Sequence, residues 1–228
     1  MEYKIIGNTV PVVEMTLKNG ETVYTQSGGM AYQSAGIDMK TNARGGLFSS
    51  IGRMFTGESV FMVNYTATQD DAMVAFASTV PGNIVPFDLS KVKEGLIIQK
   101  GAFLCAESSV NTKVTFTKKL SAGFFGGEGF VLQHATGDGK IFLEVDGDPI
   151  EKELKAGEVI KVDTGNIVAF EPNMPYEVEM IKGLGNIFLG GEGLFLTKIT
   201  GPGKVILQSQ NFGDFAGKII PYLPTNNK

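Results

Sequence analysis

Cysteine, histidine, tryptophan and arginine are scarce in this chain of 228 residues. Cysteine occurs only as Cys105, histidine only as His134, and arginine only as Arg44 and Arg53, while tryptophan is absent. A single cysteine excludes an intramolecular disulfide and any metal site built from several thiolates. A single histidine excludes HExxH zinc proteases, facial-triad iron sites and multi-histidine metal sites. We therefore expect neither a bound metal nor a cofactor.

Positive charge and long apolar runs are also lacking. The chain has 20 Lys and Arg against 24 Asp and Glu, which gives a net charge of −4. This balance is poorly suited to holding phosphodiester backbones, so we do not expect a nucleic-acid partner. The N-terminus has no signal-peptide pattern, and runs such as 60–63 and 167–170 are far shorter than the roughly 20 residues that span a bilayer. The sequence predicts a cytoplasmic protein without a transmembrane segment.

Glycine is abundant, with 30 residues, and it marks three signatures that recur in the same order. One is a glycine followed by apolar residues, at 28–33, 101–107 and 165–171. Another is a Gly-Glu pair in an apolar setting, and a third is a Thr-Gly turn before apolar residues. Equivalent positions in the second and third copies lie 64 residues apart. From first to second copy the offsets are 73, 70 and 70, so the first copy carries insertions.

This spacing predicts three similar modules, at about 1–86, 87–150 and 151–210, followed by a tail at 211–228. A unit of this length exposes too much surface to be stable alone, so we expect the three to share one core. The prediction is a single pseudo-threefold domain over residues 1–228.

Within each module the pattern is typical of β-strands. Segments such as 22–25, 114–117, 159–162 and 176–180 are rich in β-branched and aromatic residues. They are separated by turn signals such as Asp138-Gly139, Asp146-Gly147 and Pro202-Gly203, which are frequent in hairpins. The fold class is therefore all-β. Two helices are also predicted, one at 47–55 and one at 211–223, and the second is expected to pack on the β core.

The string at residues 45–59, the Gly-Gly-Glu-Gly repeats and the tail at 220–224 together resemble a known family. It is the bacterial uncharacterised family whose mitochondrial relatives are called altered inheritance of mitochondria protein twenty-four, and the resemblance covers essentially the whole chain. It implies three repeats of a short double-stranded β-helix, similar to the subunit of the tryptophan RNA-binding attenuation protein, closed as a ring within one chain. The family supplies no established reaction and no catalytic residues. Its mitochondrial relatives are linked to inner-membrane organisation, which suggests a scaffold or membrane-proximal role.

The Gly-Glu pairs supply the candidate site residues Glu58, Glu128 and Glu192. If these carboxylates converged on the axis of a ring, their repulsion would raise at least one pKa or recruit a cation. The alternative, which we favour, is a structural role in which each carboxylate accepts backbone N–H groups of a glycine turn.

Apolar, glycine-rich stretches precede these glutamates at 47–55, 122–125 and 184–189. If they were exposed on one face, they would form a patch able to meet a membrane, a lipid or a second copy of the chain. Burial around the axis is the alternative that we favour.

Three other features give weaker signals. Cys105 lies in an apolar strand, and neither it nor His134 has a counterpart in the other modules, so we do not expect a nucleophile and base pair. The acidic segment 144–149 lacks the remaining ligands of a calcium loop. The region 138–179, with 11 acidic residues against 4 lysines, is expected to be a solvated acidic face.

The sequence thus predicts a non-enzymatic scaffold or interaction protein, with an unknown protein or lipid partner and the option of homo-oligomers. The alternative is a small-ligand binding module with a site between the β modules. No catalytic residue is assigned.

Overall fold

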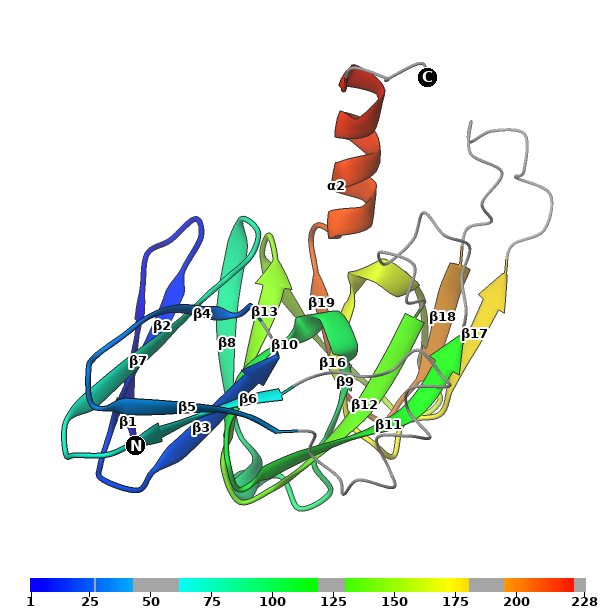
Figure 1. The fold of residues 1–228 in the computed structure, drawn as a ribbon. Coiled ribbons are helices and arrows are strands. Elements are labelled where there is room, and N and C mark those ends of the chain that lie inside the picture. Colours follow the sequence, from blue (N-terminus) through cyan, green and yellow to red (C-terminus); the bar gives the residue numbers. More distant parts are fainter. Residues whose placement is uncertain (27, 43–61, 119–129, 181–194, 224–228) are drawn as a thin grey trace.

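The computed structural model describes residues 1–26, 28–42, 62–118, 130–180 and 195–223 (Figure 1). Its strands form four antiparallel sheets, which we call sheets A to D. The prediction of a mostly β protein with one short C-terminal helix is confirmed. Among the described residues no helix is long and apolar enough to cross a membrane.

Sheets A and B contain strands β1 to β8 together with β10 and β13. Sheet A has the order β1 (Glu2–Ile6), β2 (Val12–Leu17), β7 (Ala72–Ala77), β4 (Met30–Gln33). Sheet B has the order β5 (Ile37–Asn42), β6 (Met62–Ala67), β3 (Thr22–Gln26), β10 (Phe103–Glu107), β13 (Lys140–Asp146), β8 (Gly82–Asp88).

Sheets C and D contain the remaining strands. Sheet C has the order β11 (Val110–Lys118), β12 (Phe130–Gly137), β9 (Leu96–Gln99), β16 (Ile167–Phe170), β19 (Gly203–Gln208), β14 (Pro149–Leu154). Sheet D has the order β15 (Val159–Asp163), β18 (Phe195–Thr200), β17 (Tyr176–Met180). The described helices are η1 (Leu89–Lys91), η2 (Lys100–Ala102), η4 (Thr164–Asn166), α2 (Phe212–Ile219) and η5 (Ile220–Tyr222).

The sheets are stacked face to face from A to D, left to right in Figure 1. Three apolar clusters hold the stack together: one between sheets A and B, one between B and C, and one between C and D. Sheets B and C are therefore covered on both faces. This explains why β9 and β16 are continuous buried runs, whereas β2 of the outer sheet A alternates between buried and partly exposed residues.

Sheets B and C share one strand plan. Adding six to each strand number of sheet B gives the order of sheet C. Each is made of two three-stranded halves, joined by the pair β3–β10 in sheet B and by β9–β16 in sheet C. Sheet D has the strands expected of the first half alone, and β2, β7 and β4 of sheet A have those of the second half. No pairing of β15 with β4 occurs among the described residues, so closure of a ring within one chain is not confirmed.

The predicted turns are present, but they do not close hairpins. Gly147 has a φ of +71° after Asp146, as a tight turn requires, yet β13 and β14 on either side of it belong to different sheets. The turns between β12 and β13 and between β18 and β19 also connect different sheets. The expected hairpin at Asp146-Gly147 is therefore wrong. Each of these turns carries the chain from one layer of the stack to the next.

The C-terminal helix does not pack as predicted. Asn211 caps α2 by accepting the N–H of Asp214 at 2.8 Å, but no residue of the helix is buried. The helix projects from the stack (Figure 1), with Phe212 and Ile219 exposed. The expectation that it covers the β core is wrong, because sheets B and C already cover each other.

Candidate functional site

The sequence-based site candidates fall largely outside the described residues. Glu58, Glu128 and Glu192 lie there, as do the apolar stretches 47–55, 122–125 and 184–189 and the helix expected at 47–55. The strands that precede and follow each of these three regions pair with each other: β5 with β6, β11 with β12, and β17 with β18. The two interpretations of the glutamates and of the apolar stretches therefore stay predictions.

Cys105 and His134 are not brought together. Cys105 is fully buried in β10 of sheet B, and burial raises the pKa of its thiol well above the usual value. His134 lies in β12 of sheet C, where its Nε2 is 2.6 Å from the carbonyl oxygen of Glu94. A thiol without an adjacent base is not activated as a nucleophile.

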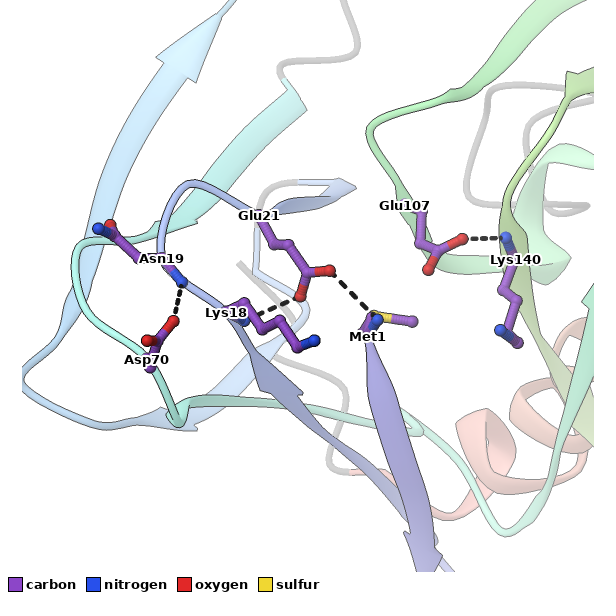
Figure 2. A network of polar contacts seen from close by, with 7 residues as sticks. All are labelled: Met1, Lys18, Asn19, Glu21, Asp70, Glu107 and Lys140. Atoms are coloured by element: carbon purple, nitrogen blue, oxygen red, sulfur yellow. Dashed lines mark hydrogen bonds and ion pairs between the residues drawn. The ribbon is translucent and has the colours of Figure 1, made fainter.

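Carboxylates in glycine turns have a structural role elsewhere in the chain. Figure 2 shows Glu21, whose carboxylate accepts the N–H of Lys18 at 2.8 Å and pairs with the Met1 ammonium at 3.2 Å. The hydrogen bond from Lys18, followed by the pairing with the N-terminus, lowers the pKa of Glu21 despite partial burial. Glu158 makes the same bond to the N–H of Lys155, also at 2.8 Å. No cluster of three or more potential metal-binding side chains occurs in the described part of the chain.

The strongest candidate site is a pair of exposed strand edges at the two ends of the stack. β4 is the edge of sheet A, and none of its residues is buried. Its counterparts β10 and β16 lie inside sheets B and C and are almost entirely buried. β15 is the edge of sheet D and is mostly exposed or half-buried, whereas its counterpart β9 is buried throughout. An exposed edge offers unpaired N–H and C=O groups to another strand.

The two internal junctions define how such edges would pair. β10 and β16 each carry a bulge, and the residue after the bulge, Cys105 or Ala169, lies opposite Thr25 or Ile98 respectively. β4 has the same bulge, directly before Tyr32.

In β15, Val162 stands 64 residues after Ile98. The same register therefore places Tyr32 opposite Val162 and Gln33 opposite Lys161. The sequence alone does not reveal this site, because a strand edge is defined by which strands pair and not by a motif.

Comparison with known proteins agrees with this fold. The model of the mitochondrial biogenesis AIM24 family matches residues 3–210. An uncharacterized protein of Streptococcus pyogenes serotype M6 is 31% identical over 225 residues, which are 95% of this chain and 88% of that protein. The X-ray crystal structure of a protein from Streptococcus pyogenes is 28% identical, with a TM-score of 0.78 over 97% of this chain and 99% of the other. The chain belongs to the mitochondrial biogenesis AIM24 family.

Proposed function

We propose that this protein is a non-enzymatic scaffold whose copies join head to tail, with β15 of one copy adding to β4 of the next. One observation carries the proposal: sheets A and D contain the two complementary halves of a sheet whose complete form occurs twice within the chain. Joining them would create the order β17-β18-β15-β4-β7-β2, which is the plan of sheets B and C. The scaffold would thus extend by the same contact that already links its own modules.

Burial supports the direction of this assembly. Tyr32 is 40% exposed in β4, although its counterparts at the internal junctions, Cys105 and Ala169, are fully buried. Strand addition would remove the Tyr32 side chain from water and satisfy the edge hydrogen bonds. A triplicated origin of the modules is consistent with the repeated strand plan.

The test uses two single-cysteine additions, Tyr32→Cys and Val162→Cys, prepared separately in the full chain. Residues opposite each other in an antiparallel ladder have Cα atoms about 4.5–5.5 Å apart, which suits a disulfide. Mild oxidation of the mixture should give a covalent dimer on a non-reducing gel, while each variant alone should remain at 24.4 kDa. Cys105 is buried and should not react.

The matched control replaces Val162→Cys by Ile160→Cys, two residues away on the same strand face. Its Cα would lie about 7–8 Å from that of Tyr32, which is too far for an unstrained disulfide. The proposal would be wrong if the mixture with Ile160→Cys cross-linked as well as the mixture with Val162→Cys, or if the mixture with Val162→Cys gave no dimer. A wild-type chain that sediments as a monomer at all concentrations would do the same.

A membrane-proximal position of this scaffold is a second candidate, and α2 favours it. Its apolar residues Phe212, Phe215 and Ile219 lie on one helix face and are each at least 40% exposed. Such a face suits the interfacial zone of a lipid bilayer.

A further inference from the structure

A cavity of about 610 Å³ lies between η2, η4 and the first turn of α2, at the ends of β13 and β19. It lies where sheets B and C meet and is separate from the strand edges described above. A volume of this size is typical of small-molecule sites and far exceeds that of a single metal ion. The residues that line the cavity determine which class of ligand it can bind.

Two carboxylates line this cavity. Glu144 is 7% exposed, and its Oε1 accepts hydrogen bonds from the Ser78 hydroxyl at 2.9 Å and from the N–H groups of Thr79 and Val80 at 2.5 and 3.3 Å. Its Oε2 has no hydrogen-bond partner among the described residues. The solvated acidic face expected for region 138–179 is therefore wrong at Glu144.

Asp146 is the second carboxylate. Its Oδ2 accepts the N–H of Phe212 at 2.9 Å, which anchors the start of α2, while its Oδ1 has no partner within the described ranges. Each carboxylate thus uses one oxygen for structure and keeps the other available.

Gln99 provides an independent sign that the cavity is built for a ligand. It is 6% exposed and lines the cavity, yet its carboxamide makes no hydrogen bond to any described residue. The neighbouring amide of Gln208, in contrast, accepts the Asp146 N–H at 3.0 Å and donates to the Gly165 carbonyl at 2.8 Å. The Gln99 carboxamide thus lines the cavity without a protein partner, and it can hydrogen-bond to a molecule bound there.

The negative charge of the residues that line the cavity favours a cationic ligand. No lysine, arginine or histidine lines the cavity among the described residues, and its apolar surface comes from groups such as Ala102, Phe212 and Ala216. Three acceptors are available: Glu144 Oε2, Asp146 Oδ1 and Gln99 Oε1. A primary ammonium group has three donors and one positive charge, which match them in number and sign.

We propose that this cavity binds a small organic cation, with a primary ammonium held by Glu144, Asp146 and Gln99 and an apolar body packed against Ala102 and α2. The site lies within one chain, so it can exist whether or not copies of the chain assemble. It gives a concrete form to a small-ligand site between modules.

The test is calorimetric titration of the full chain at pH 8 with n-hexylamine, 1-hexanol and hexanoate. These probes share an apolar chain and differ in charge. The amine should bind at least tenfold more tightly than the alcohol or the acid. Equal binding of amine and alcohol, or no heat from the amine at millimolar concentration, would overturn the proposal. Binding of calcium chloride in competition with the amine would also overturn it, in favour of a metal site.

Variants then locate the site. Asp146→Asn retains an acceptor for the Phe212 N–H and should weaken amine binding at least fivefold. Asp148→Asn removes the same charge from an exposed residue outside the cavity, and binding should stay within twofold.

Gln99→Leu changes no charge and should also weaken binding by several-fold, which keeps the test valid if Asp146→Asn folds poorly. Equal losses from Asp146→Asn and Asp148→Asn would show a nonspecific charge effect and reject the site.

Discussion

Asp146 holds its negative charge in unfavourable surroundings. Burial is the largest cause of its raised pKa, and repulsion by Glu144 adds to it, while the hydrogen bond from the Phe212 N–H opposes the shift. The result is a pKa of about 6, against a usual value of 3.8. Between these two values the folded protein binds a proton that the unfolded chain releases, so the contribution of Asp146 to stability falls as the pH rises.

Asp146→Asn should remove this pH dependence. The free energy of unfolding of the wild type should decrease relative to the variant between about pH 4 and pH 7, by roughly 1–2 kcal/mol once the shift is discounted for the solvent that screens a partly exposed carboxylate. Urea unfolding at pH 4.5, 6 and 8 would measure it. Taking the difference between the two proteins cancels other groups, including Asp163, whose pKa is raised mainly by burial. Parallel curves for the two proteins would contradict the assignment.

The position of Asp146 also shows what sequence reasoning could reach. Asp146-Gly147 was recognisable as a turn, because aspartate and glycine supply the local geometry. Its burial was not recognisable, since it depends on Phe212, 66 residues away, and on Gln208 of a different sheet. The same holds for Gln99, whose cavity is assembled from segments distant in the chain.

At the scale of elements, strands and turns were predictable, but sheet membership was not. Short runs bounded by glycine specify extended segments locally, and the 64-residue spacing predicts equivalent strands. Whether a turn joins partners or crosses between layers depends on long-range packing. The runs of β9 and β16 gave one usable hint, because a strand without polar alternation is covered on both faces.

The sequence predicts the helix α2, but it does not predict that this helix projects from the sheets with no buried residue. A helix of eight residues is marginal on its own, and here its anchors are the Asn211 cap and the bond from Phe212 to Asp146. Burial of its exposed apolar face would therefore stabilise the helix, and the surface of a lipid bilayer could bury that face.

Vesicle flotation tests this role of α2. The full chain should float with phosphatidylcholine vesicles. For the double variant Phe215→Ser with Ile219→Ser, the fraction of protein recovered with the vesicles should fall to a small part of the wild-type value. Neither residue lines the cavity, to which α2 contributes Phe212, Gly213 and Ala216. A matched control, Val114→Ser, alters an exposed apolar residue of β11 and should float like the wild type. Equal recovery of all three proteins, or none from the wild type, would contradict a lipid role.

At the scale of the whole molecule, the stack ends where its pattern predicts another strand. Sheets B and C each contain both three-stranded halves, whereas sheet A ends at the edge strand β4 and sheet D ends at the edge strand β15. We call the proposed contact between β4 of one copy and β15 of another the seam. Glycine spacing predicts repeated modules, but the sequence could not show that strands distant in the chain share each sheet. That sharing is what leaves half a sheet at each end.

Charge at the seam gives the last prediction. The junction register places Gln33 of one copy opposite Lys161 of the next, and Gln33 Oε1 is buried without a partner among the described residues. Cross-strand pairs of opposite charge stabilise a ladder by roughly 0.2–1 kcal/mol, and like charges destabilise it. Gln33→Glu should therefore tighten self-association by up to about fivefold, and Gln33→Lys should weaken it by a similar factor. Sedimentation velocity over a concentration series would measure both.

The same pair of changes at Asn111, an exposed residue of β11 away from the seam, separates a local pairing effect from an effect of net charge. Asn111→Glu and Asn111→Lys alter the charge of the chain equally but face no residue of a neighbouring copy in this geometry. They should leave association unchanged within twofold. Since the wild-type charge is −4, general repulsion between copies would instead make every added lysine favourable and every added glutamate unfavourable. The two models thus predict opposite signs at Gln33, and the order of the Gln33 variants decides between them.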